Sequence, residues 1–319
     1  MTRRSIKFRM VSLSAIALIT LIWFAGCSSD NSVEPQELAT TDQQAMKTIA
    51  ESDESIASFE PNYNDGDAVA FALGKIATTV YPVKVSHRVV RIASDLQTTV
   101  QGDTSYGVLT QTYSGTLKIY ASYTPAVKGD TASVDTVITK EFTSQITRNI
   151  IFVKVAKTKR PLDNWKIAAI SLPEGGTMTA NVRINNMIVY MPGDTLLINS
   201  PNNYYLYRNV ARKRFTPQFS KGQEMKVRIE VQSAYADTEL VSVTYGADKK
   251  GFNRSKRTLT LVSSVPGPAG FTKIYEATWK ANNYMGHYHA VVNVVPKQVL
   301  NDDAAPVEEK TWGIPYYIK

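Results

Sequence analysis

Residues 116–123 read Thr-Leu-Lys-Ile-Tyr-Ala-Ser-Tyr, so apolar side chains stand at every second position. This period places alternate side chains on opposite faces, which is typical of a strand with one buried face. The same alternation runs through residues 83–89, and Gln101-Gly102-Asp103 forms a turn after it. A further strand region ends near Lys157, and Trp-Lys-Ile-Ala-Ala-Ile at 165–170 is expected to form the last strand of this group. The pattern predicts long antiparallel strands.

Helices are expected before these strands. Residues 41–44 (Thr-Asp-Gln-Gln) have the spacing of a capping box, and Asp67 is a second candidate for a helix start. The apolar residues that follow recur at helical spacing: Met46, Ile49, Ile56 and Phe59 in the first helix, and Val69, Ala72, Leu73 and Ile76 in the second. Helices followed by antiparallel strands predict an α+β domain over residues 41–175, with helices packed on one sheet face.

This order of elements, ending in the Trp-Lys-Ile strand, resembles the nuclear-transport-factor-like and cystatin-like cone folds over roughly residues 41–172. The resemblance implies a curved sheet wrapped around helices. That group includes enzymes and many domains without catalysis, and none of its catalytic residues can be placed on this sequence.

The remainder, residues 176–319, is predicted to be all β. Short alternating runs are separated by turns rich in Gly, Pro and Asn, and no helix is expected after Met178. The runs are 182–184, 227–231, 241–245, 259–261, 275–279 and 288–294. Their number and spacing resemble an immunoglobulin-like β-sandwich that lacks the usual cysteine pair.

The N-terminal residues have the three parts of an export signal. Four basic residues are followed by an uncharged, mostly apolar stretch at 10–25, which is too short for a comfortable membrane span. It ends in Phe24-Ala25-Gly26-Cys27, which resembles the lipobox of bacterial lipoproteins. The resemblance implies a signal peptide at 1–26, lipid on Cys27 and a flexible tether at 27–40. A plain secretory signal and a retained membrane anchor are the alternatives.

Composition narrows the classes of partner. Removal of residues 1–26, which carry four basic residues and no acid, lowers the net charge from +8 to +4. Such an exported chain is expected to meet membrane and envelope material instead of nucleic acid. Ser28 and Ser29 after the cysteine favour the outer membrane, if the cell has one. Cys27 is the only cysteine, and the sequence has no nucleotide-binding glycine motif, so no cofactor is expected.

Few residues suit catalysis or metal binding, and no catalytic residue is assigned. His287 and His289 are expected on the solvent face of their strand, as weak metal candidates without a third ligand. The carboxylates Asp302-Asp303 and Glu308-Glu309 are expected to be solvated. His87 shares the side of its strand with the neighbouring valines, and it is the only histidine available to a pocket in the first domain.

The most unusual stretch combines aromatic, amide and cationic side chains between residues 202 and 219. Aromatic faces stack on sugar rings, amides bond hydroxyls, and arginines pair with acids. The candidate ligand-binding residues are Tyr204, Tyr205, Tyr207, Arg208 and Arg212. A structural loop is the alternative for this stretch. The expected function is non-catalytic binding or scaffolding, with an envelope glycan or protein as ligand. An enzyme, or an accessory component of a surface assembly, is the alternative.

Overall fold

The computed structural model describes residues 41–59, 69–70, 80–125, 133–179, 181–191, 193–208, 216–248 and 254–319. All of these belong to one compact unit, Ala39–Lys319. The protein is mostly β-strand, with a curled antiparallel sheet. The predictions for residues 1–40 and for Arg212 lie outside the described residues.

The first helix begins where the capping box predicts. Thr41 caps α1 (Asp42–Ser52), and the Thr41 and Gln44 side chains satisfy each other's backbone N–H groups. A second short helix, α2 (Glu54–Ala57), follows directly after Asp53. The helix predicted from Asp67 is not seen in the two residues described there: Val69–Ala70 form strand β1, which pairs with β2. The rest of that prediction lies outside the described residues.

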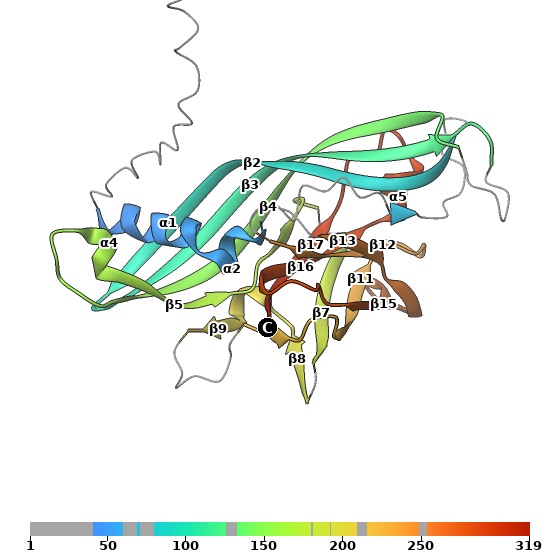
Figure 1. The fold of residues 1–319 in the computed structure, drawn as a ribbon. Coiled ribbons are helices and arrows are strands. Elements are labelled where there is room, and N and C mark those ends of the chain that lie inside the picture. The colour runs from blue at the N-terminus through green and yellow to red at the C-terminus, as the bar shows by residue number, and fades with distance from the viewer. Residues whose placement is uncertain are drawn as a thin grey trace, which may run out of the picture. The chain divides into compact units, whose positions relative to one another are not determined.

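Three long strands form an antiparallel meander, as the period of two predicts. They are β2 (Tyr81–Gln101), β3 (Thr104–Ser122) and β4 (Thr136–Lys154), and Gly102 occupies the turn between the first two with a φ of +62°. Figure 1 shows α1 lying across these strands. The helix also contacts β5 (Trp165–Ser171) and the short α4 (Pro161–Asn164). Met46, Leu109 and Phe152 fill the interface without exposure.

The sheet continues beyond residues 165–170, the strand expected to be the last of its group. Residues 174–176 form β6 (Glu174–Gly176), which pairs on one side with β4 and on the other with β17 (Lys310–Ile318). The expected boundary at 175/176 therefore falls inside a strand. One sheet joins strands from both predicted domains, in the order β1-β2-β3-β4-β6-β17-β16-β12-β13.

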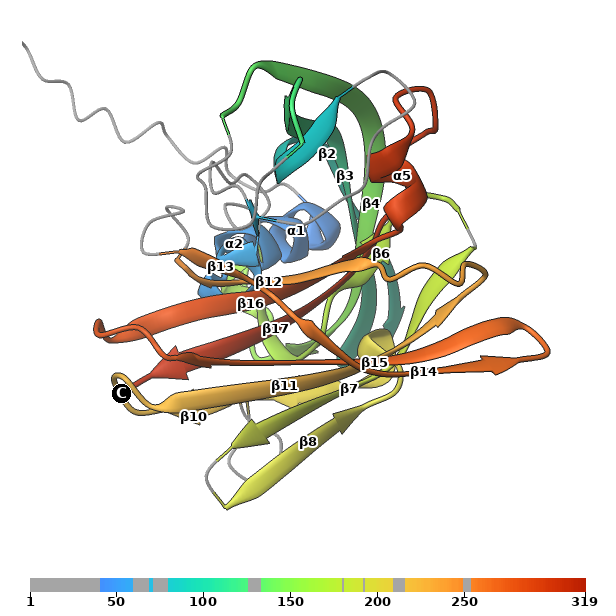
Figure 2. The same ribbon diagram turned by 90° about the vertical axis from the view of Figure 1, so that its right-hand side faces the viewer.

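A second sheet of five strands packs on the C-terminal part of the first (Figure 2). Its order is β14-β15-β11-β7-β8. Val227 and Ile229 of this sheet share one apolar core with Val243, Val292 and Ile314 of the other. Its strands are β7 (Val182–Met191), β8 (Asp194–Ile198), β11 (Glu224–Ser233), β14 (Thr260–Gly267) and β15 (Gly270–Lys280).

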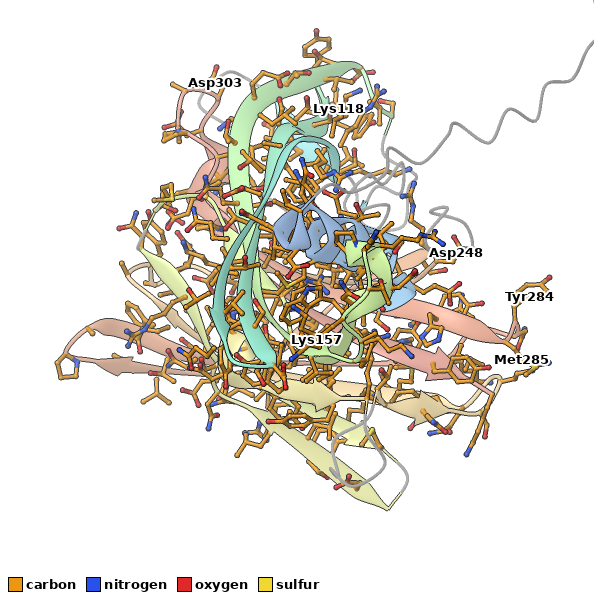
Figure 3. All side chains as sticks on the ribbon, turned by 90° about the vertical axis from the view of Figure 1, so that its left-hand side faces the viewer. Lys118, Lys157, Asp248, Tyr284, Met285 and Asp303 are labelled. Atoms are coloured by element: carbon orange, nitrogen blue, oxygen red, sulfur yellow. The ribbon has the colours of Figure 1, made fainter. Side chains whose placement is uncertain are left out.

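The remaining elements complete the first sheet and its connections. Two short helices lie in the region predicted to have none, η1 (Pro201–Asn203) and α5 (Lys297–Asn301), each placed in a connection between strands. The other strands are β9 (Tyr205–Tyr207), β10 (Gln218–Phe219), β12 (Leu240–Ala247), β13 (Ser255–Thr258) and β16 (Gly286–Val295). The loop between β15 and β16 carries Tyr284 and Met285, both more than 60% exposed, outward from the strands (Figure 3).

Candidate functional site

A surface with two cavities lies on the outer side of β4. Even-numbered residues of this strand, such as Ile146, Ile150 and Phe152, are buried on the helix side. Odd-numbered residues point the other way and keep some exposure; they are Gln145, Thr147, Asn149, Ile151 and Val153. At about 3.4 Å per residue the row is about 27 Å long. We call this row the β4 face, and a cavity lies at each of its ends.

The first cavity, which we call the tyrosine cavity, has a volume of about 380 Å³. Ile151 and Val153 of the β4 face line it, together with side chains from β3, β5 and β9. Aromatic and cationic groups form its wall: Tyr106, Tyr207, Lys166 and Arg208. Tyr106 is 47% exposed. The cavity therefore offers ring faces and positive charge beside an apolar floor.

Two of the predicted tyrosines reach this surface because β9 pairs with β5. Leu206 is buried, so Tyr205 and Tyr207 on either side of it share the outer face, with ring centroids 6.3 Å apart. Burial raises the pKa of Tyr205, and a hydrogen bond with Asn149 opposes that shift. Tyr204 is half-buried and packs against the apolar core.

Arg208 is fixed at the rim of the tyrosine cavity by an ion pair. Its guanidinium lies 2.6 Å from the carboxylate of Asp53, the residue that caps α2. The structure thus brings Tyr205, Tyr207 and Arg208 together, as the sequence suggested. Tyr106 and Lys166 were missed, because strand register alone brings them to this place.

The second cavity, which we call the junction cavity, lies where β4, β6 and β17 meet and has a volume of about 470 Å³. Gln145 and Thr147 of the β4 face line it. Its chemistry comes from other elements, which contribute Glu174, Arg183, Asn202, Lys310 and Trp312. Burial raises the pKa of the Glu174 carboxyl, and the backbone N–H of Asn202 opposes that shift.

Asn202 joins the junction cavity to the middle of the β4 face. Its side-chain amide donates to Thr147 Oγ1 at 2.9 Å, and its carbonyl accepts from Asn149 Nδ2 at 2.9 Å. Its own Oδ1 is buried and has no hydrogen-bond partner among the described residues. A buried acceptor without a partner is costly, so a donor that reached this atom would be stabilised.

Two glycines allow β6 to fit beneath the junction cavity. A Cβ on Gly175 would lie 1.8 Å from the Gln145 carbonyl oxygen of β4. A Cβ on Gly176, whose φ is +129°, would lie 2.1 Å from the Glu309 carbonyl oxygen. Only a strand without side chains here can approach both neighbours, and it leaves bare backbone lining the cavity.

The expectation that Glu308-Glu309 would be solvated is wrong. Both are buried, because the segment leading into β17 is hydrogen-bonded to Thr177 and Val182. Glu308 accepts from the Val182 N–H at 3.1 Å, and Glu309 lies 3.3 Å from His87 Nε2. Asp302 and Asp303 are exposed as expected, and Figure 3 shows Asp303 projecting outward.

The expectation for the C-terminal histidines is wrong for His289. Helix α2 covers that face of β16, so His289 is fully buried and its Nδ1 lies 2.6 Å from Ser58 Oγ. Burial lowers the pKa of His289 well below its ordinary value. His287 is partly exposed, 3.8 Å from Glu54. Within the described ranges, no group of three His, Cys, Asp or Glu is placed to hold a metal ion.

Among the helices that the structure describes, none is long and apolar enough to cross a membrane. Comparison with protein-family models and with curated proteins found no match for this chain.

Proposed function

We propose that this protein is a lipid-anchored envelope protein that binds a glycan along the β4 face without catalysing a reaction. The observation that carries the proposal is the β4 face itself, an open row about 27 Å long on one strand with a cavity at each end. An extended polymer of repeating units fits such a surface better than a single small molecule does.

The side chains favour a sugar over an apolar peptide. Tyr106 and Tyr207 offer ring faces at one end of the β4 face. Beyond them stand amides and hydroxyls, and Asn149, Asn202 and Thr147 already hold one another by hydrogen bonds. Groups held in this way lose little freedom when a hydroxyl-rich ligand binds.

Removal of one aromatic ring tests the binding. Tyr207→Ala in the full-length protein, purified in detergent, is expected to weaken binding to the recognised glycan about two- to tenfold, because one stacked ring contributes about 0.5–1.5 kcal/mol. Isothermal titration calorimetry with a soluble glycan, first identified on a glycan array, measures the change in affinity. Tyr284→Ala removes an exposed tyrosine from a loop outside both cavities and should leave the affinity unchanged. Equal losses in both variants would contradict the assignment.

The anchor is part of the proposal. A signal peptide at 1–26, lipid on Cys27 and a tether at 27–40 would hold the β-rich unit at a membrane, with the outer membrane favoured where one exists. Cys27→Ala is expected to abolish incorporation of labelled fatty acid and to leave an uncleaved precursor, because no other thiol is present. Labelled fatty acid still found on that variant would contradict lipidation at Cys27.

We also propose the finer fold assignment. Helices α1 and α2 beside the long meander favour a cone-like domain at 41–175, and the second sheet facing β12, β16 and β17 favours an immunoglobulin-like sandwich at 176–319. The strand β6 would then belong to both.

An enzyme is the second candidate function, favoured by the surroundings of His87. This side chain is 4% exposed, with Glu309 at 3.3 Å from one ring nitrogen and Lys256 Nζ at 3.4 Å from the other. A histidine oriented by a carboxylate is suited to acid–base chemistry. Catalysis would depend on His87 and not on Tyr207, whereas glycan binding would depend on Tyr207. A role in a surface assembly remains the third alternative.

A further inference from the structure

The junction cavity contains two groups that the fold leaves without partners. Arg183, on β7, lines this cavity with an exposed side chain and makes no ion pair with any residue the structure describes. The second is the buried Asn202 Oδ1. Arg183 is a cation with five N–H donors, so it requires an anionic acceptor on a ligand. Asn202 Oδ1 is an acceptor, so it requires a donor.

The other charges of the cavity are already engaged. Lys310 Nζ donates to the Thr177 carbonyl at 2.7 Å, and burial lowers the pKa of this amine. The Glu174 carboxyl accepts from the backbone N–H of Asn202. This leaves Arg183 as the cation of the cavity for a ligand to pair with, and Glu174 and Asn202 as acceptors for hydroxyl groups.

We propose that the junction cavity selects an acidic sugar, a ring that carries a carboxylate together with free hydroxyls. This inference rests on the proposed glycan-binding function and names the class of glycan. The carboxylate pairs with the Arg183 guanidinium, whose planar fork matches two carboxylate oxygens. The ring hydroxyls donate to Asn202 Oδ1 and to Glu174, so that the buried acceptor gains the partner that it lacks.

The lining of the cavity also argues against a ligand that binds by charge attraction alone. An anion held only by diffuse positive charge would not need Asn202, and it would be repelled by Glu174. A sugar acid uses Asn202 and tolerates Glu174. Its hydroxyls can face these two acceptors while its carboxylate, on a different ring position, faces Arg183. Thr147 and Gln145, which line the same cavity, lead from it onto the β4 face, where further units of the chain would lie.

The test uses the full-length protein in detergent, at about 0.15 M salt to screen diffuse attraction. The probes are a panel of uronic acid oligosaccharides, each paired with its methyl ester, which keeps the shape and removes the charge. The panel also includes neutral oligosaccharides. We expect at least one free acid to bind ten times or more tighter than its ester. Arg183→Gln should remove that preference, and Arg183→Lys should restore part of it.

The control variant is Arg257→Gln, which removes the same charge from an exposed site on the edge strand β13. It should keep the preference for the acid. If Arg257→Gln and Arg183→Gln lose the preference equally, diffuse charge explains it and the inference is overturned. If acids and esters bind alike, or only neutral glycans bind, the inference fails while the glycan-binding proposal stands. If no oligosaccharide binds, both proposals fail.

Discussion

Gly175→Ala is expected to lower the free energy of unfolding by at least about 3 kcal/mol, at the upper end of the usual cost of overpacking. The reason is a contact with backbone, because the new Cβ would lie 1.8 Å from the Gln145 carbonyl oxygen and 2.9 Å from Ile146 Cα. Neither atom is the end of a side chain that can rotate away. Either β6 or β4 must shift, and the pairing that joins the two parts of the sheet is lost.

Urea denaturation followed by circular dichroism measures this change. Gly193→Ala is the matched control, because Gly193 has a φ of +72° and a Cβ added to it would meet nothing within 4 Å. Its expected cost is only that of the left-handed backbone, about 1–2 kcal/mol. Gly175 does not have a positive φ. Comparing the two variants therefore separates the cost of close contact from the cost of backbone strain. A smaller loss for Gly175→Ala than for Gly193→Ala would show that β6 is not held tightly between its neighbours.

Lys273→Met is expected to destabilise the protein by about 3–5 kcal/mol, because it leaves a buried carboxylate without its cation. Lys273 and Glu239 are both fully buried and lie 2.7 Å apart. The same amine donates to the carbonyls of Tyr235 and Asp237. The Tyr275 hydroxyl donates to the other Glu239 oxygen at 2.6 Å, and burial raises the pKa of Tyr275, so that this proton stays in place.

The surface pair Lys226–Glu276 provides the comparison on neighbouring strands. Its atoms are 2.8 Å apart, but the two side chains are 40% and 23% exposed. Lys226→Met should therefore change the free energy of unfolding by less than about 1 kcal/mol. Combining Lys273→Met with Glu239→Gln should recover part of the loss, because the isolated charge is removed. Equal costs for Lys273→Met and Lys226→Met would contradict this account of the buried pair.

Local patterns in the sequence predicted the local structure. The capping box at Thr41 starts α1, and the period of two marks the long strands and most of those after Met178. Alternation reports one buried face and cannot show that a second layer covers the other. For this reason His289 was expected in solvent, whereas α2 buries it; Glu309 was expected there because it belongs to a run of charged residues, and it is buried as well.

The same limit applies to the candidate site. Tyr205, Tyr207 and Arg208 are close in sequence, so their composition indicated a binding surface. Tyr106 reaches its cavity through the pairing of β3 with β4, and Arg183 reaches the other through the packing of β7 against β17; no short-range pattern encodes either. The run Pro173-Glu174-Gly175-Gly176 has the composition of a turn, yet its glycines serve close strand approach, a use that only the neighbouring backbones reveal.

The position of β6 has a consequence for the order of folding. Its partner β17 lies roughly 130 residues later in the chain, and contacts between such distant segments form slowly because a long loop must close first. Until β17 arrives, β6 and β16 each present an unpaired edge, and unpaired edges invite association with other chains. The protein is therefore most prone to aggregation in the interval before its C-terminal strand docks, when a chaperone would be of greatest use.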